Sequence, residues 1–183
     1  MSEARMERSE YGLTAATEGW FVVHVSDAAW MTNDYFGEAC VFEGDAVGFP
    51  DVGYTIHVLR PGQPNGLYHH ERDQEDFLVL AGECIAIVEG VERRMRSWDF
   101  LHCPPGTEHI FVGAGEGPCV IFMAGGRAHR GSAVYTPSEV ALRYGASAES
   151  DSTPADRPYM PFPQWEPGPP ASFDELPFGL GAS

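Results

Sequence analysis

Short apolar or alternating runs, separated by turns rich in Gly, Pro and Asp, fill most of the chain before residue 136. The runs contain many β-branched and aromatic residues, a composition that favours strands. They cover residues 20–25, 38–43, 54–60, 77–80, 84–89, 92–96, 100–103, 109–112 and 119–123. Turn pairs such as Pro61-Gly62, Ala81-Gly82 and Pro105-Gly106 recur between them at near-regular spacing. This rhythm predicts an all-β domain, folded as an antiparallel sandwich or barrel.

One short helix is predicted after this β-rich region. Thr136 and Glu139 have the spacing of a capping box, with Pro137 at the first helical position. The run 140–144 follows and ends at Gly145.

The end of the chain differs in composition, since eight of the 15 prolines lie between residues 154 and 177. Proline lacks a backbone donor and fixes φ, so this tail cannot form a helix or a central strand. The tail also carries aromatic side chains, and we therefore expect it to pack on the barrel or on a partner. These aromatics are Tyr159, Phe162, Trp165, Phe173 and Phe178. The expected organisation is an N-terminal segment 1–11, a β-barrel domain 12–146 and a Pro-rich tail 147–183.

The net charge and the absence of lysine argue against several classes of function. The net charge is −16, and all eleven basic residues are Arg. Without Lys, Schiff-base chemistry is excluded. The negative charge argues against nucleic acid and anionic membrane as partners.

Four separated cysteines, with no C-x-x-C pair, predict free thiols rather than a disulfide framework. The first ten residues carry no apolar signal-peptide core. We expect a cytoplasmic protein.

Candidate metal ligands concentrate between Tyr68 and Glu75. This segment holds His69, His70 and Glu71, with Glu75 opening the next strand. Residues two apart in a strand share a face, so His69 and Glu71 can point together into a barrel. A further ligand must come from elsewhere, and His109, after the turn 104–106, is the candidate.

These residues resemble the two motifs of the cupin superfamily, G-x5-H-x-H-x3/4-E-x6-G and G-x5-P-x-G-x2-H-x3-N. Gly82 follows Glu75 after six residues, and Pro104, Gly106 and His109 match P-x-G-x2-H. About seventy residues are covered. The resemblance implies an antiparallel double-stranded β-helix, the cupin or jelly-roll barrel, with a bound metal. It also implies a homodimer.

The first motif departs from the family pattern, because no H-x-H occurs. One register uses His69 and Glu71 and supplies four ligands, namely His69, Glu71, Glu75 and His109. The other uses Tyr68 and His70 and keeps Gly62 five residues upstream, but offers three ligands and a phenol. We prefer the first. Two imidazoles and two carboxylates suit a divalent transition metal, Fe, Mn, Ni or Zn, without choosing among them.

The resemblance then implies a metal-dependent enzyme of dioxygenase or isomerase type that acts on a small organic molecule. The alternative is a non-catalytic cupin that binds metal or a small ligand, with a degenerate site. No residue is identifiable as a general base. Phe77, Val79, Phe111 and Met123 are candidate pocket walls or core residues.

Other polar residues are expected to lie outside the ligand set. His57 is expected in the barrel wall. Because His102 and Cys103 alternate on one strand, only one can face the cavity, and a small buried thiol is the default for Cys103. Arg127 could clamp a carboxylate, but a solvated strand edge is its default interpretation.

Overall fold

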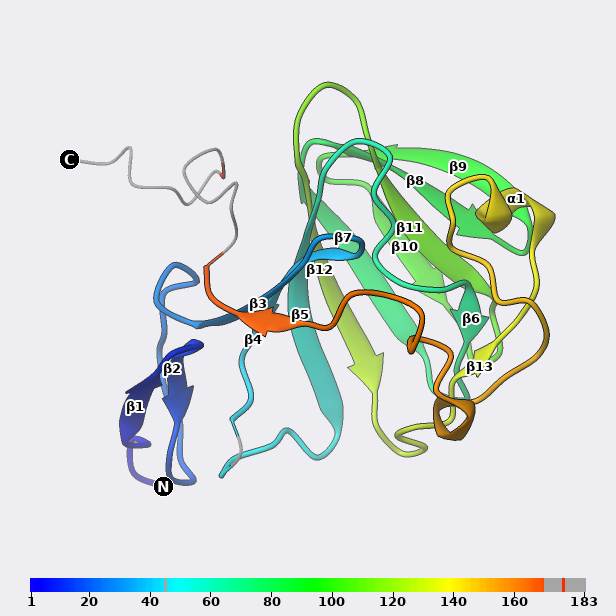
Figure 1. Ribbon diagram of the computed structural model, residues 1–183. Helices are drawn as coiled ribbons and strands as arrows, with labels where there is room; N and C mark the ends of the chain where they lie inside the picture. The colour runs from blue at the N-terminus through cyan, green and yellow to red at the C-terminus, as the bar shows by residue number, and fades with distance from the viewer. Residues whose placement is uncertain (45, 170–175, 177–183) are drawn as a thin grey trace.

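Two antiparallel sheets face each other in the computed structural model, which describes residues 1–44, 46–169 and 176 (Figure 1). The larger sheet has seven strands in the order β10-β7-β12-β5-β4-β3-β14. They are β3 (Ala29–Asn33), β4 (Gly37–Val41), β5 (Val52–Leu59), β7 (Glu75–Ala81), β10 (Phe100–Cys103), β12 (Cys119–Gly126) and β14 (Glu166–Pro167).

The smaller sheet has five strands in the order β13-β6-β11-β8-β9. They are β6 (His69–His70), β8 (Glu83–Val88), β9 (Val91–Arg96), β11 (His109–Ala114) and β13 (Val134–Tyr135). All these neighbouring strands pair antiparallel. The predicted all-β antiparallel fold is confirmed.

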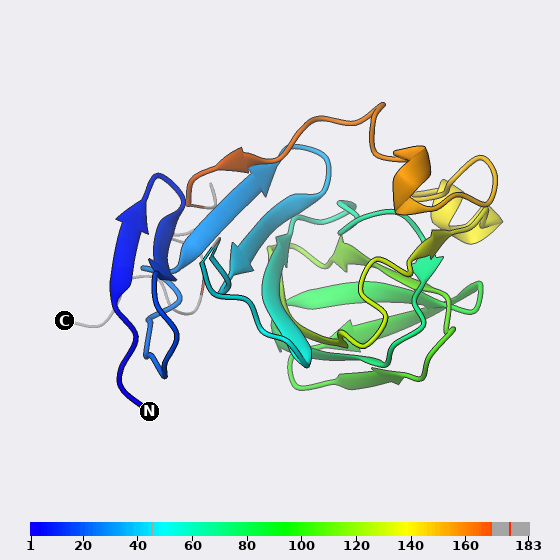
Figure 2. The same ribbon diagram turned by 90° about the horizontal axis from the view of Figure 1, so that it is seen from below.

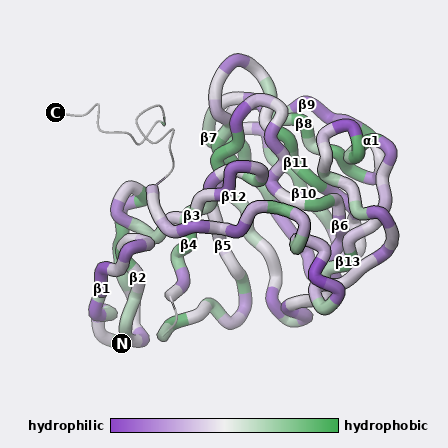
Figure 3. The backbone as a smooth tube through the Cα atoms, in the orientation of Figure 1, coloured by the Kyte–Doolittle hydropathy of each residue, from purple (hydrophilic) through white to green (hydrophobic). Residues whose placement is uncertain are grey.

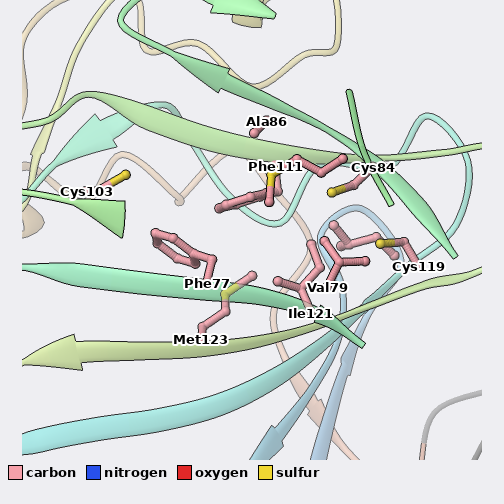
Figure 4. Packing of buried hydrophobic residues seen from close by; sticks show 11 residues of the cluster. Phe77, Val79, Cys84, Ala86, Cys103, Phe111, Cys119, Ile121 and Met123 are labelled. Carbon is pink, nitrogen blue, oxygen red and sulfur yellow. The ribbon is translucent and has the colours of Figure 1, made fainter. Parts of the chain in front are cut away.

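The main core lies between the two sheets. Alternate residues of β7 and β12 point inward and meet residues of β8 and β11 from the other sheet. Figure 4 shows Phe77 and Phe111 pointing toward each other from opposite sheets, with ring centroids 4.6 Å apart. In Figure 3 the hydrophobic positions gather in the barrel strands around β8 and β11, whereas β1 is largely hydrophilic.

All four cysteines are free and buried, as predicted. Cys84, Cys103 and Cys119 lie in the main core, and Cys40 lies in a second cluster on the other face of the larger sheet. Burial raises the pKa of both Cys40 and Cys103 to about 12, so neither is a thiolate at neutral pH.

The N-terminal region differs from the sequence-based expectation. A hairpin of β1 (Met6–Ser9) and β2 (Gly12–Ala15) spans the predicted segment boundary at residue 11 (Figure 2). The strand predicted over 20–25 is wrong, because only Trp20 forms an isolated bridge, to Glu3. Val23 and Val25 pack instead on the second cluster, whereas Trp20 and Val22 are exposed, so the apolar composition of the run reflects burial only in part.

Helices are few and short in the described part of the chain. The predicted helix is α1 (Glu139–Leu142), and η1 (Pro154–Asp156) is a single 3-10 turn. The cap expected at Thr136 is wrong: Ser138 is the N-cap, and its hydroxyl accepts from the Ala141 backbone N–H. None of the described helices has the length and apolar character needed to cross a bilayer.

The described part of the tail lies along the barrel. Its aromatic rings, Tyr159 and Phe162, pack around Phe36 with centroid separations of 5.2 and 4.9 Å. The Asn33 side chain donates to the Pro163 carbonyl over 2.8 Å, and β14 pairs with β3. Two tail aromatics named in the sequence, Phe173 and Phe178, fall outside the described residues.

Candidate metal centre

Three candidate ligands converge at one end of the barrel. His69 on β6 and His109 on β11 stand directly opposite each other in the strand register, with ring centroids 5.0 Å apart. Glu75 opens β7 in the facing sheet, where it pairs with Cys103 and Gly125. One carboxylate oxygen of Glu75 lies 3.5 Å from Nε2 of His109. One ligand atom from each of the three residues lies within 4.8 Å of the others.

Backbone carbonyls orient both imidazoles in the same way. Nδ1 of His69 lies 2.8 Å from the Leu67 carbonyl oxygen, and Nδ1 of His109 lies 3.0 Å from that of Thr107. A neutral imidazole that donates from Nδ1 leaves its Nε2 lone pair as an acceptor. This anchoring of one ring nitrogen while the other remains free is typical of metal-binding histidines.

Burial stabilises the neutral form of both imidazoles and makes the charged form of both carboxylates less favourable. It lowers the pKa of His69 to about 3, with a smaller contribution from His109, and it lowers the pKa of His109 as well. Burial, followed by the charges of Glu71 and Asp73, raises the pKa of Glu75 to about 8. The pKa of Glu71 is raised by burial and by Asp73.

These residues therefore fit a divalent cation. Metal binding requires neutral histidines and charged carboxylates, and a bound dication would offset the repulsion between Glu71 and Glu75. Ligand atoms about 2.0–2.3 Å from a common ion lie within about 4.6 Å of one another, close to the spacing found.

The three ligands line a cavity of about 350 Å³. This volume lies at the small end of the range for ligand pockets, about 300–1,000 Å³. Phe77 and Met123 form part of its wall, as predicted, whereas Val79 and Phe111 belong to the core and are not among the lining residues. Polar lining residues include Thr55, His57, Asn65, Glu71, Arg127 and Arg130.

The structure separates the two registers considered for the first motif. His69 lines the pocket, but Tyr68 and His70 do not. The Tyr68 ring is buried in a separate cluster, and its hydroxyl accepts from the Gly90 backbone N–H over 2.8 Å. Glu71 lines the same pocket but lies outside the group of three whose ligand atoms converge.

The other residues considered in the sequence, His57, His102 and Cys103, lie as their strand positions predict. His57 lines the pocket wall. Cys103 faces the core, and His102 faces outward, where its Nδ1 lies 2.6 Å from an Asp76 carboxylate oxygen.

Arg127 departs from its default interpretation, because it is not a solvated edge residue. Its guanidinium lines the pocket and forms an ion pair with Glu43, with Nη1 3.0 Å from Oε1. The two residues are 84 positions apart in the sequence. No local sequence signal pairs them, and none singles out Asn65, which also lines the pocket.

Comparison with solved structures finds several similar proteins. The polyketide cyclase RemF from Streptomyces resistomycificus has 16% identity and a TM-score of 0.51, over 59% of this chain and 80% of that chain. At that identity the likeness concerns the fold alone. An RmlC-like cupin from Shewanella frigidimarina has 19% identity and a TM-score of 0.45, over 55% and 85%.

A sugar phosphate isomerase from Silicibacter pomeroyi has 26% identity and a TM-score of 0.44, over 50% of this chain. The chain spans 59% of that isomerase's length. No curated protein matches the chain significantly.

The family comparison locates the motif residues within a known domain. Residues 55–125 match the family model described as the cupin domain, from β5 to β12. This span contains His69, Glu75 and His109 and most strands of the two facing sheets, which form a double-stranded β-helix. Residues 55–125 of the chain therefore form a cupin domain.

Proposed function

We propose that the protein binds a divalent transition metal through His69, Glu71, Glu75 and His109 and acts on a small organic molecule in the adjoining pocket. The observation that carries the proposal is the convergence of two backbone-anchored imidazoles and Glu75 within 4.8 Å. Fe, Mn, Ni and Zn all accept this ligand set.

Glu71 is the proposed fourth ligand. It lines the same pocket, and its charge contributes to the raised pKa of Glu75, which places the two carboxylates in each other's field. Its side chain is flexible, and attraction to a dication favours its approach to the other three.

The proposed activity is of dioxygenase or isomerase type. A metal held here would supply Lewis acidity or a site for activating oxygen or water. The chain itself would bind and orient the substrate in the cavity, with Phe77 and Met123 limiting water and the polar wall residues fixing orientation.

A second candidate function is binding without catalysis, by a cupin with a degenerate site. The observation that favours it is Glu71, which stands where the family motif has a histidine and lies outside the convergent group. Loss of this one ligand would weaken metal binding without disturbing the barrel.

Metal content tests both candidates. Inductively coupled plasma mass spectrometry of the native protein is expected to find about one equivalent of a transition metal, and a His69→Ala, His109→Ala double variant should lack it. His102→Ala, which removes an exposed histidine, is the matched control and should retain the metal. A native protein with no more metal than the double variant would reject the site.

A further inference from the structure

His57 presents a polar group in the pocket that the protein itself does not use. It lies on β5 opposite Ile121 of β12, whose side chain belongs to the core between the sheets, so both face the barrel interior. Among the described residues, neither ring nitrogen of His57 has a hydrogen-bond partner, and its Nδ1 is buried. His69 and His109, by contrast, each have Nδ1 anchored on a carbonyl.

An unsatisfied buried polar atom destabilises the folded protein, so its presence needs an explanation. Burial lowers the pKa of His57 to about 4, and the ring is therefore neutral near pH 7. A neutral imidazole can both donate and accept one hydrogen bond. The neutral ring of His57 therefore suits a hydroxyl or carbonyl group of a ligand better than a charged group.

Asn65 adds a weakly bonded donor to the same pocket. Its side-chain oxygen accepts from the Phe111 backbone N–H over 2.9 Å, which fixes the amide orientation. Its Nδ2 has only the Met123 sulfur, 3.9 Å away, and a thioether is a weak acceptor. One of the two arginines that line the pocket, Arg127, is already paired with Glu43.

The tail supports His57 from the other side. The Trp165 ring meets the His57 ring edge-on, with an interplanar angle of 85° and centroids 6.3 Å apart. Trp165 is held between two anchors, the hydrogen bond from Asn33 to Pro163 and the pairing of β14 with β3. Figure 2 shows the tail running along the sheet edge toward β3. A segment outside the matched cupin span thus packs against a residue that lines the pocket.

We propose that His57, aided by Asn65, hydrogen-bonds a second oxygen function of the organic ligand, and that Trp165 positions His57 for this contact. The ligand class is a small molecule with at least two separated oxygen functions, one for the metal and one for His57. The inference rests on the proposed metal site.

The test uses cobalt(II) as the metal and a graded set of 2-hydroxy acids as ligands. Glycolate carries no further hydroxyl, glycerate carries one and gluconate carries several. Each is titrated into the cobalt-loaded full-length protein, and binding is followed by the visible absorption of the cobalt. At least one hydroxylated acid is expected to bind about fivefold more tightly than glycolate, as one added hydrogen bond would give.

His57→Phe is the decisive variant, because it keeps an aromatic ring against Trp165 and removes the hydrogen bond. It should lose the fivefold gain while glycolate binds as in the native protein. Trp165→Ala should reduce the gain, and Trp165→Phe should restore it, which a merely structural role would not predict. If His57→Phe loads less cobalt than the native protein, His57→Leu replaces it in the same comparison.

The outcomes separate the two proposals. Failure of the native protein to bind cobalt rejects the metal site and this inference with it. Normal cobalt binding with equal affinities for all three acids, or a gain that survives in the His57 variant, rejects the inference and leaves the metal site standing.

Discussion

At the scale of single residues, each of the two candidate imidazole ligands combines one local constraint with one distant neighbour. His69 and His109 both anchor Nδ1 on the carbonyl two residues earlier, a short-range device that the sequence contains. Their approach to Glu75 depends on strand pairing between segments far apart in the chain. The orientation of each imidazole therefore depends on its local sequence, whereas its approach to Glu75 depends on the tertiary fold.

Glu75→Gln should separate the electrostatic role of the carboxylate from metal binding. With metal removed by chelator, the folded pKa of Glu75, about 8, lies above the usual 4.5. Its contribution to stability is therefore present at acid pH and lost as pH rises toward 8. At pH 9 the metal-free Gln variant should be more stable than the native protein by about 1–3 kcal/mol. Added metal should stabilise only the native protein.

Urea unfolding with and without metal measures both effects. Asp99→Asn, at an exposed turn, serves as the control for removing one negative charge. Equal metal-induced stabilisation of native and Gln proteins would show that Glu75 is not a ligand.

His57 gives a pH dependence of opposite sign. Its folded pKa, about 4, lies below the usual 6.5, so the unfolded chain binds the proton first as pH falls. Because the folded protein holds His57 neutral, its free energy of unfolding falls as pH drops from 6.5 toward 4. Between pH 7 and pH 5 the native protein should lose about 2 kcal/mol more than His57→Phe, since each pH unit between the two pKa values is worth about 1.4 kcal/mol. Urea titrations at both pH values check this, and parallel losses would contradict it.

At the scale of elements, β6 shows how little regular structure the site requires. It has two residues, His69 and His70, yet it is paired on both sides, by β11 and by β13. Strands of this length are marginal alone. Its neighbours, rather than its own propensity, give His69 its place.

The turn between β7 and β8 provides an element-scale prediction. Gly82 has φ +73°, and a Cβ there would clash with the Pro118 carbonyl oxygen. Gly90 has a similar φ of +71° but open space around it. Gly90→Ala should cost about 1–2 kcal/mol from the left-handed backbone alone, and Gly82→Ala should cost more. Chemical denaturation of both variants tests this, and equal losses would argue against the close approach.

At the scale of the whole molecule, the tail links parts of the barrel that are distant in sequence. Tyr159 accepts a hydrogen bond from the Leu67 backbone N–H over 3.0 Å, two residues before His69. Its ring also packs on Tyr135, which in turn contacts His69, with centroids 5.3 and 5.6 Å apart. The tail therefore contributes to barrel stability and lies against the proposed metal centre.

Deleting residues 147–183 should lower the melting temperature by roughly 5 °C or more, given about 2–4 °C per kcal/mol for a chain of this size. Differential scanning calorimetry measures the effect, and Met160→Ala, at an exposed tail position, is a control that should melt like the native protein. An unchanged melt after deletion would mean that the tail does not stabilise the barrel. Gel filtration of the same proteins tests the homodimer implied by the family resemblance.

The sequence predicted the barrel better than its periphery. Alternation along 77–80 and 119–123 reflects burial between two sheets, and those strands formed where expected. The run 20–25 is also rich in β-branched and aromatic residues, yet it is irregular: Val23 and Val25 cover the second cluster without strand partners, and Trp20 and Val22 are exposed. An apolar composition indicates that part of a segment is buried, but a buried segment need not form a strand.

By itself, the sequence determined the all-β class, the motif spacing and the group from which the ligands come, because these depend on local periodicity and residue type. The tertiary structure decided that His69 rather than His70 reaches the pocket, that Glu71 stands apart from the other three, and that Arg127 pairs with Glu43. It also brought Trp165 to His57. These are contacts between residues far apart in the chain, and only strand register and sheet packing can fix them.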